Sequence, residues 1–454
     1  MEKMTLAEIV QAVDGSFGYS ADITVDNIST DTRTISKGSV FVAIKGEKAD
    51  GHDYGKQAMD LGAEAVIAER VIDDAKCIIV DSTRQALLEL ASYYRSKFNI
   101  PLIGITGSVG KTSTKDMIAL VLSEQFYTLK TEGNHNNDIG VPWTLFGLDN
   151  SYTAAVVEMG MNNFGEISRL SLCSKPTMAV ITNIGDSHIG NLGSRENILK
   201  AKMEILDGAD YEAPLILNRD DKFLYNAEIH GSRKVIYYSV KKKDCDVYAT
   251  NIVVLDNGIK FDINYPQGKI SAVINCLGVH NVKNALAAFC VGLELGIDPE
   301  KMVKGIAKFK PDGIRQNVRT VNDKTFIVDC YNASPDSMEA AIDMLSQYKE
   351  KNGGMGYCVL ADMLELGDMS KKLHKSVGEY VASSGCDKLL CYGDMSVNYI
   401  DGAVKKGFNP ECCKHFATHE ELADYLKENL KENDAVLFKG SRGMKLEEVV
   451  NALE

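Results

Sequence analysis

The stretch GITGSVGKTST (residues 104–114) lies between an apolar run at 102–106 and a segment with helical spacing at 114–123. Glycines in such a loop let backbone N–H groups approach phosphate oxygens, and the N-terminus of the following helix adds the positive end of its dipole. The lysine can reach terminal phosphates, and the hydroxyl after it suits Mg²⁺. The order of strand, glycine-rich loop and helix therefore predicts a nucleotide-binding domain of the α/β class.

The residues of this loop that we expect to bind the nucleotide are Gly107, Ser108, Val109, Gly110, Lys111, Thr112 and Ser113. The longer pattern G-x-x-x-x-G-K-[ST] requires glycine at Ile105, so the chain fits the shorter form G-x-x-G-K-T. The alternative is a glycine-rich turn with a solvated lysine. The strand before the loop and the helix after it favour the nucleotide site.

Apolar runs and amphipathic segments alternate on both sides of a charged turn at 308–313. They predict strands at 154–159, 178–184, 326–330, 357–361, 389–392 and 435–438, and helices at 336–348, 371–384 and 419–431. Such alternation is typical of parallel sheets covered by helices. Ligands of these sheets gather at the carboxyl ends of the strands, so the polar residues there are the candidates for a site.

The length of 454 residues corresponds to three domains at roughly 150 residues each. One boundary is expected near the helix-like stretch 87–98, which precedes Pro101, and the other at the charged turn. We therefore predict an α/β protein of three domains. They are an N-terminal α/β domain (1–84), a central domain with a P-loop ATPase-like parallel sheet (85–312) and a C-terminal Rossmann-like domain (313–454).

Composition excludes several classes of protein. The formal net charge of −13 disfavours binding to nucleic acid or anionic lipid, although a local cluster of donors can still bind small anions. The N-terminus has no apolar core of signal-peptide length, and no apolar run reaches about 18 residues. We expect a cytoplasmic protein without a membrane span. Its 11 cysteines lack metal-ligand spacing and are expected to be reduced and mostly buried.

Acidic, amide and imidazole side chains follow two of the predicted strands. Glu158 ends the first, where a carboxylate can face the phosphate loop and hold Mg²⁺. Asn183, Asp186 and His188 follow the second. Alone, a glutamate at a strand end is more often a surface or cap residue. A lone histidine is usually structural, and the position of His188 favours a structural and a functional role equally. Lys202 lies in an amphipathic helix, where the residues alone favour a solvated side chain.

Short polar side chains also gather in loops of the middle and last thirds of the chain: Asn136, Asn137, Asp329, Asn332 and Ser334. Such side chains either build turns or orient a carboxylate or phosphate without adding charge. Asn281 precedes an apolar helix at 282–295 and is expected to cap it.

Together these segments resemble the Mur ligases, the family that builds the peptide of the bacterial peptidoglycan precursor. The N-terminal part contributes STDTR at 29–33, KGSVFVA at 37–43, Gly46 and DGH at 50–52. The middle contributes the phosphate loop, EMG at 158–160, NIG at 183–185 with His188, and AKMEI at 201–205. HN at 280–281, Arg315 and Asp329 follow in the family's order. The match runs over nearly the whole chain, which makes the resemblance specific.

The resemblance implies an ATP-dependent ligase that forms an acyl phosphate, from which an incoming amine displaces phosphate. In such a site Lys111 would stabilise the transferring phosphoryl group. Thr112 and Glu158 would hold the Mg²⁺ that bridges the β- and γ-phosphates. His188 would bind a second Mg²⁺, and Lys202 would be carbamylated by CO₂ to become a metal ligand.

The same resemblance assigns residues to the substrates. Asn281 and Arg315 would contact ATP, and Asp329 its ribose. The N-terminal domain would bind the UDP-linked substrate through Ser29, Thr30, Asp31, Arg33 and Gly46, and Asn136 and Asn137 would line the channel toward the metals. Asn332 and Ser334 would lie near the incoming dipeptide. Because Arg315 lies beyond the second boundary, we expect domain closure to complete the site.

Three segments distinguish the branches of the family: DCYNASP at 329–335, DMLELG at 362–367 and KGSR at 439–442. They resemble the branch that joins D-alanyl-D-alanine to UDP-N-acetylmuramoyl-tripeptide, and a monomer is expected on the same ground. Ser334 stands where that branch usually has Asn.

Three alternatives stay open. The first is the preceding Mur ligase, which would carry an Asp-Asn-Pro-Arg or related motif that this sequence lacks. The second is a ligase like folylpolyglutamate synthase, which would lack the DTR and DGH motifs of the N-terminal part. The third is a nucleotide-dependent binding module without synthesis, in which the asparagine loops would be only structural.

Overall fold

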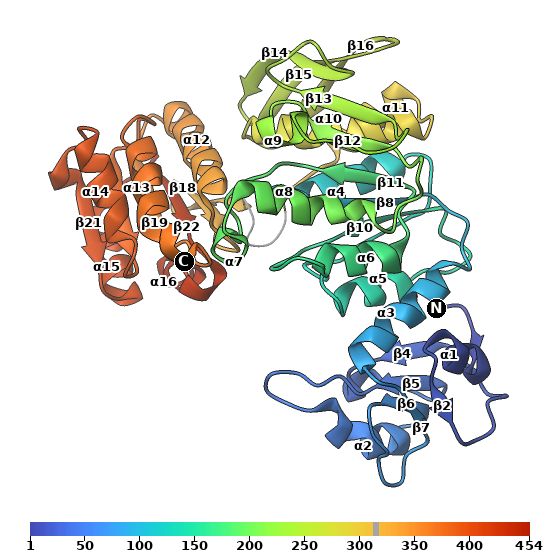
Figure 1. The fold of residues 1–454 in the computed structure, drawn as a ribbon. Coiled ribbons are helices and arrows are strands. Elements are labelled where there is room, and N and C mark those ends of the chain that lie inside the picture. The colour runs from blue at the N-terminus through green and yellow to red at the C-terminus, as the bar shows by residue number, and fades with distance from the viewer. Residues whose placement is uncertain (312–316) are drawn as a thin grey trace.

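The computed structural model describes residues 1–311 and 317–454. Three large sheets follow one another along the chain: five strands within residues 16–79, nine within 102–274 and six within 317–439. Figure 1 shows them as three lobes, blue, cyan to yellow, and orange to red. The prediction of an α/β protein with three domains is confirmed.

The central sheet has the strand order β16-β15-β14-β13-β12-β11-β8-β10-β9. Its parallel part consists of β8 (Leu102–Thr106), β9 (Thr128–Lys130), β10 (Ala154–Glu158), β11 (Met178–Ile181), β12 (Leu215–Asn218) and β13 (Val235–Ser239). Because β8 lies between β10 and β11 and all three run the same way, the phosphate loop, Glu158 and the segment after β11 meet at one edge.

The rest of this sheet departs from the prediction of parallel strands. β14 (Val247–Leu255) runs parallel to β13, but β15 (Gly258–Tyr265) and β16 (Gly268–Ile274) continue as an antiparallel meander. Two-residue connections join these strands, and such short connections fit only antiparallel neighbours. The turn sequence Asp256-Asn257-Gly258 is a hairpin signal that we missed.

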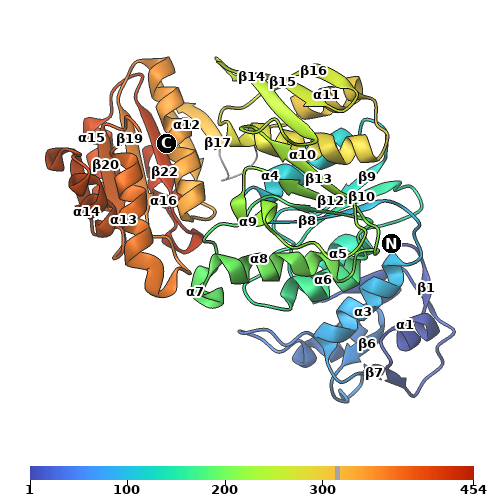
Figure 2. The ribbon, with the colours of Figure 1, turned by 45° about the horizontal axis from the view of Figure 1, so that its top comes forward.

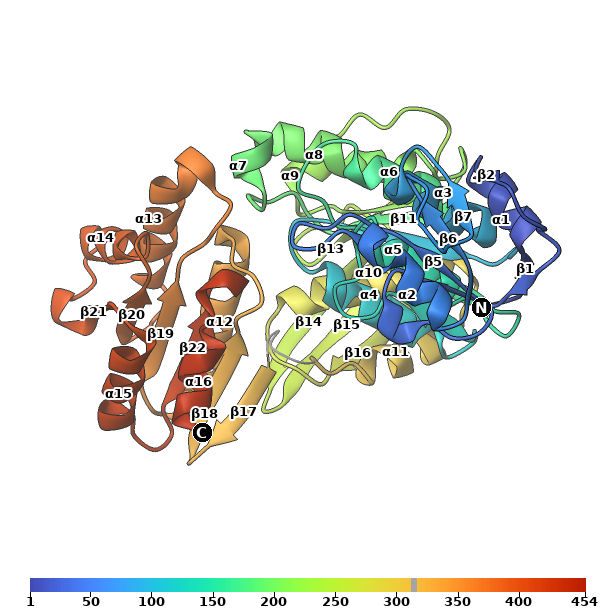
Figure 3. The same ribbon diagram turned by 90° about the horizontal axis from the view of Figure 1, so that it is seen from below.

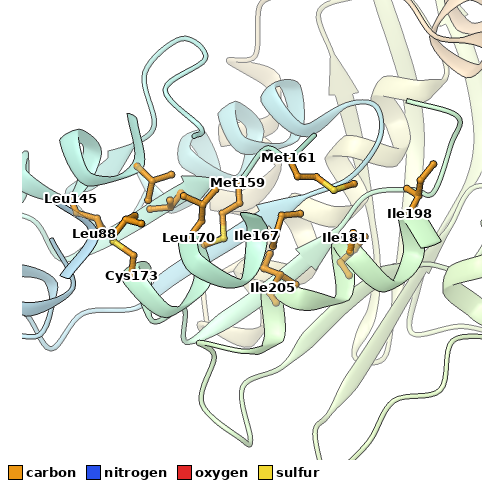
Figure 4. Packing of buried hydrophobic residues seen from close by; sticks show 14 of the residues in the cluster. Leu88, Leu145, Met159, Met161, Ile167, Leu170, Cys173, Ile181, Ile198 and Ile205 are labelled. Carbon is orange, nitrogen blue, oxygen red and sulfur yellow. The ribbon is translucent and has the colours of Figure 1, made fainter. Parts of the chain in front are cut away.

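Helices cover both faces of the central sheet. Ile103 and Ile105 of β8 pack in one apolar cluster with α4 (Lys111–Leu122), α10 (His280–Glu294) and α11 (Pro299–Ala307). Leu102 belongs to the cluster of the other face, because neighbouring strand residues point to opposite sides. That face is covered by α3 (Thr83–Arg95), α5 (Gly140–Phe146), α6 (Glu166–Ser174) and α8 (Arg195–Met203). Figure 4 shows Ile167, Leu170 and Cys173 of α6 packed near Met159 and Ile205.

The N-terminal lobe holds a mixed sheet in the order β2-β7-β6-β5-β4. Its elements are β2 (Ser16–Phe17), β4 (Asn27–Ser29), β5 (Ser39–Val42), β6 (Ala63–Ala68), β7 (Cys77–Ile79), α1 (Leu6–Ala12) and α2 (Gly55–Asp60), with β1 (Met4–Thr5) and β3 (Thr24–Val25) paired separately. The predicted boundary at 84–85 lies in the first turn of α3, which packs against both α1 and the central helices α5 and α6.

The C-terminal lobe has the strand order β17-β18-β22-β19-β20-β21. Its strands are β17 (Asn317–Val321), β18 (Lys324–Asp329), β19 (Gly356–Ala361), β20 (Lys388–Tyr392), β21 (Cys413–Phe416) and β22 (Ala435–Lys439). Its helices are α12 (Pro335–Asn352), α13 (Ser370–Val381), α14 (Val397–Lys405), α15 (His419–Asn429) and α16 (Glu447–Leu453). The four strands and three helices predicted here are confirmed, and β17 is antiparallel to β18. The second predicted boundary lies at the residues outside the described ranges.

Two expectations from composition can be compared with the structure. All 11 cysteines are free thiols, and seven of them are buried, as predicted. Within residues 1–311 and 317–454, every helix is too short or too polar to cross a membrane. Figure 2 shows the C-terminal lobe beside the central lobe, with α12 on the side that faces it.

Candidate functional site

A cavity of about 730 Å³ lies between the carboxyl edge of the central sheet and the C-terminal lobe. Its volume is in the range of cofactor sites. Among its lining residues are most of those predicted for the site: Ser108, Val109, Gly110, Lys111, Thr112, Ser113, Asn136, Asn137, Glu158, His188, Asp329, Asn332 and Ser334. The fold therefore brings together residues from five separate parts of the sequence.

The phosphate loop depends on two glycines. Gly107 has φ +151°, and a Cβ there would lie 1.9 Å from Oγ1 of Thr182. Gly110 has φ +81° and leads directly into α4, which begins at Lys111. The predicted helix start at residue 114 was wrong, because the left-handed glycine turns the chain into the helix three residues earlier. Lys111 Nζ donates to the carbonyls of Gly107 (2.9 Å) and Ser108 (3.4 Å).

The segment after β11 holds the loop in shape. The Val109 N–H donates to Asn183 Oδ1 (2.9 Å), and Asn183 Nδ2 donates to the Val109 carbonyl (2.8 Å). Thr182 Oγ1 donates to the same carbonyl (2.7 Å), and the Gly185 N–H donates to Ser108 Oγ (2.8 Å). Asn183, to which no role was assigned from the sequence, therefore fixes the apex of the loop before any ligand binds.

Glu158 offers one carboxylate oxygen that the protein leaves unused. The side chain is fully buried at the end of β10, and Oε1 accepts a hydrogen bond from Asn136 Nδ2 (2.8 Å). Oε2 is buried and has no hydrogen-bond partner. A buried, unpaired carboxylate oxygen beside the hydroxyl-bearing phosphate loop fits a Mg²⁺ ligand. The described ranges contain no group of three His, Cys, Asp or Glu side chains placed to hold a metal, so nucleotide oxygens would have to complete the coordination.

Lys202 is buried rather than solvated, which contradicts the reading from the residues alone. It lies on α8, is 1% exposed, and has no hydrogen bond or ion pair with any residue in the described ranges. Burial, together with the positive charge of Lys111, lowers the pKa of Lys202 well below its usual value. A neutral buried amine is a nucleophile, which is the state that reaction with CO₂ requires.

His188 contacts the C-terminal lobe. Its backbone has φ +64°, and its Nδ1 lies 2.8 Å from Oε2 of Glu365. Contact with His188 lowers the pKa of Glu365 below its usual value. The imidazole lines the cavity, so the contact joins the central site to the other lobe.

A buried ion pair lies at the edge of the C-terminal sheet. Lys439 at the end of β22 is 1% exposed, and its Nζ lies 2.5 Å from Oδ2 of Asp329 at the end of β18. The same Nζ donates to the carbonyl of Asn332 (3.1 Å). Ser334 is the N-cap residue before α12, and its N–H donates to Ser337 Oγ (2.9 Å). Lys439 was noted in the sequence only within the KGSR motif, yet it lines the cavity.

Asn281 does not cap α10, so that prediction was wrong. The helix begins at His280, and Asn281 lies inside its first turn, fully buried. Its Nδ2 donates to the Leu277 carbonyl (2.9 Å), and its Oδ1 accepts from Asn284 Nδ2 (3.2 Å). Asn284 Oδ1 in turn accepts from Thr114 Oγ1 (3.1 Å), so these amides connect α10 to α4 behind the loop. Arg315 lies outside the described residues.

The residues predicted for the UDP-linked substrate form a separate group in the N-terminal lobe: Ser29, Thr30, Asp31, Arg33 and Gly46. None of these five is among the residues that line the cavity. Arg33 is largely exposed, pairs with Asp31 (2.5 Å) and lowers the pKa of that carboxyl. Arg84 pairs with Asp138 (2.7 Å) and donates to the Lys45 carbonyl (3.4 Å), which connects this lobe to the asparagine-rich loop.

Several charged residues of the cavity were not predicted, among them Arg195, Lys241, Lys283 and Asp336. Arg195 makes two hydrogen bonds of 2.6 Å to Asp186 and lies 3.8 Å from Asp336 at the start of α12. Burial lowers the pKa of Lys283 and raises that of Asp336. The sequence does not predict that these residues line the cavity, because their position there depends on how the two lobes contact each other.

Three family models match the chain in order. They describe the Mur ligase family catalytic domain (residues 24–95), the Mur ligase middle domain (105–292) and the Mur ligase glutamate ligase domain (315–442). The middle-domain match begins within β8 and includes the phosphate loop.

Relatives match over the full length. The UDP-N-acetylmuramoyl-tripeptide–D-alanyl-D-alanine ligase of Bacillus subtilis is 38% identical over 461 aligned positions, covering 100% of this chain and 99% of that protein. A crystal structure of MurF from Acinetobacter baumannii has a TM-score of 0.92 at 32% identity and covers 100% and 99% of the two chains. A structure of MurF ligase from Thermotoga maritima in complex with ADP has a TM-score of 0.84 at 27% identity and covers 94% and 96%.

Proposed function

This chain belongs to the Mur ligase family, and from that premise we propose that it joins D-alanyl-D-alanine to UDP-N-acetylmuramoyl-tripeptide. ATP is the co-substrate, and ADP and phosphate are released in this step of peptidoglycan precursor synthesis. One structural observation carries the proposal: the phosphate loop and the strand ends of the C-terminal lobe line the same cavity. The full-length similarity to ligases of this specificity favours it over the preceding ligase, over a folylpolyglutamate-type ligase and over a module without synthesis.

The phosphate loop binds and orients the nucleotide. Its backbone N–H groups and the start of α4 face the phosphates, and Lys111 exchanges its loop carbonyls for the γ-phosphate. The loop is already held by Asn183, so binding costs little reorganisation. Phosphoryl transfer to the tripeptide carboxylate then requires positioning and charge neutralisation rather than a protein nucleophile.

The carboxylate of Glu158 and the hydroxyl of Thr112 are the residues that fit Mg²⁺. When bound, the ion neutralises charge on the β- and γ-phosphates. Asn136 donates to Oε1 of Glu158, while Oε2 has no hydrogen-bond partner and would be the oxygen that holds the ion. His188, and Lys202 after carbamylation, are proposed to hold a second ion near the tripeptide carboxylate. The buried, partnerless amine of Lys202 supports this modification.

The remaining assignments of substrate contacts are also proposals. Asn281, Arg315 and Asp329 serve the nucleoside, and Asn332 and Ser334 serve the dipeptide. The N-terminal group defined above binds the UDP sugar in a domain of residues 1–84, followed by domains 85–312 and 313–454. We further propose that the enzyme acts as a monomer in the cytoplasm, where both nucleotides are available.

The test is phosphate release with ATP and Mg²⁺ in the presence of UDP-N-acetylmuramoyl-tripeptide, with and without D-alanyl-D-alanine. We expect release only when all substrates are present, together with a pentapeptide product in the mass spectrum. Release with UDP-N-acetylmuramoyl-dipeptide and a diamino acid instead would identify the preceding ligase. The absence of release with every combination would leave a nucleotide-binding module.

A further inference from the structure

The short helix α7 (Ile189–Leu192) of the central lobe lies against a turn of the C-terminal lobe, residues 365–367. Figures 1 and 3 show α7 at the end of the central lobe that faces the C-terminal lobe. The Gly190 N–H donates to the carbonyl of Glu365 (3.1 Å). We call His188, Gly190, Glu365 and Gly367 the α7 contact.

The backbones at the α7 contact approach too closely for a side chain. A Cβ on Gly190 would lie 2.7 Å from the Glu365 carbonyl oxygen and 2.7 Å from the Gly367 nitrogen. Gly190 is not among the residues with positive φ, so its own conformation accepts any residue. Glycine is therefore required at this position by the approach of the two lobes and not by the local backbone.

His188 and Glu365 both adopt the left-handed backbone conformation, with φ +64° and +66°. Such conformations are strained in residues other than glycine and are found at sites where the surroundings enforce them. Here they bring Nδ1 of His188 to 2.8 Å from Oε2 of Glu365. Ile189 and Leu366, beside them, are buried in one continuous apolar cluster.

The geometry points to Glu365 as a positioning residue that the C-terminal lobe delivers to His188. The negative charge of Glu365 Oε2, 2.8 Å from Nδ1, favours a proton on that nitrogen and leaves Nε2 as the nitrogen available to a ligand in the cavity. The inference rests on the proposed role of His188 beside the phosphates. The cavity is then complete only when the α7 contact has formed. Closure of the lobes therefore also orients the imidazole of His188.

The first test uses Gly190→Ala in the full-length protein, with Gly18→Ala as a control because a Cβ there meets nothing within 4 Å. We expect Gly190→Ala to lower kcat at least tenfold and to weaken binding of a non-hydrolysable ATP analogue, because Asp329, one of the proposed nucleoside contacts, lies on the other lobe. The radius of gyration measured by X-ray scattering with that analogue should increase relative to wild type. A kcat and a radius of gyration in Gly190→Ala that equal those of the wild-type protein would overturn the inference.

The second test uses Glu365→Ala and the conservative Glu365→Gln, with the exposed Glu428→Gln as a control. Loss of the carboxylate oxygen beside Nδ1 predicts a fall in kcat of roughly 10- to 100-fold for Glu365→Ala, and the amide oxygen of Glu365→Gln predicts partial recovery. The ring ¹⁵N spectrum of His188, assigned with His188→Gln, should lose its Nδ1–H tautomer in Glu365→Ala. An unchanged tautomer would overturn the inference. The tautomer and scattering measurements need no turnover, so they remain informative if the wild-type protein is inactive and the proposed function fails.

Discussion

Lys111 and Lys202 carry the same side chain, but their surroundings give them different chemistry. Lys111 lies on the cavity wall and donates to carbonyls of its own loop, from which its ammonium group can move to a bound phosphate. Lys202 is buried beneath the site without a partner in the described part of the chain, and its lowered pKa favours the neutral amine. Substitution of Lys111 and substitution of Lys202 are therefore expected to impair the enzyme in different ways.

Lys111→Ala should abolish the stabilisation of the transferring phosphoryl group. We expect kcat to fall roughly 10²–10³-fold, the usual cost of removing one preorganised donor from a developing charge. Binding of UDP-N-acetylmuramoyl-tripeptide, measured by calorimetry, should stay within twofold of wild type because its contacts lie elsewhere. The exposed Lys431→Ala is the control. If Lys111→Ala lost both catalysis and binding of UDP-N-acetylmuramoyl-tripeptide, the assignment of separate residues to these two functions would be refuted.

Lys202→Ala should be inactive and partly restored by formate or acetate, because a small carboxylate can occupy the space of the missing carbamate. Removal of CO₂ should inactivate the wild-type enzyme but not the rescued variant. Lys200→Ala on the same helix is exposed and should behave as wild type. An unmodified lysine in the intact-protein mass spectrum, with no rescue by either acid, would exclude the carbamate.

At this scale the glycine spacing predicted a loop between a strand and a helix, and the loop lies between β8 and α4 with Glu158 at the end of the neighbouring β10. The residues alone predicted a solvated Lys202, which is wrong. The helical pattern shows that Lys202 lies on an amphipathic helix, but it does not show which segments cover the side chain. The sequence also missed the unpaired oxygen of Glu158, which exists only once Asn136 has taken its neighbour.

At the scale of elements, the parallel strands and most helices of the C-terminal lobe were predictable from apolar runs separated by turns. The start of α4 was not, because Gly110 in the left-handed region adds a turn before the apolar pattern begins. The meander β14–β16 was missed because its strands alternate only partly between buried and exposed residues, and its turn signal was not used.

The connection between α1 and α3 should make stability depend on pH. Glu8 accepts from the Thr5 N–H (2.8 Å) and Tyr93 (3.0 Å) and pairs with Lys97 (2.5 Å), and these contacts lower its pKa from 4.5 to about 2. Because the folded pKa lies below the unfolded one, the contribution is complete above about pH 4.5 and is lost as the pH falls toward 2.

Glu8→Gln should therefore lower the free energy of unfolding by about 1 kcal/mol at pH 7, since the pair is partly solvated. The difference from wild type should shrink at pH 4 and again at pH 3, as measured by urea unfolding at each pH. A difference that stays constant over this range would show that Glu8 acts through packing and not through its charge.

At the scale of the whole molecule, the site is built from segments that no local pattern connects. The central lobe supplies the phosphate loop, and the C-terminal lobe supplies Asp329 and Lys439 at the ends of β18 and β22. The sequence predicted both lobes and predicted that they close on each other. It did not predict which residues form the contact between them. Long-range pairs such as His188 with Glu365 leave no periodic signal in one sequence.

Arg195 provides the last test of that contact. Its guanidinium is hydrogen-bonded twice to the buried Asp186 and lies 3.8 Å from Asp336 of the other lobe, so Arg195→Ala would leave two carboxylates facing each other. We expect a loss of about 2 kcal/mol in the free energy of unfolding, less than for a fully buried pair because Arg195 is partly exposed. Asp336→Asn removes one of the two charges, so the double variant should be more stable than Arg195→Ala alone. Strict additivity of the two substitutions in urea unfolding would show that Arg195 serves only Asp186 and does not join the lobes.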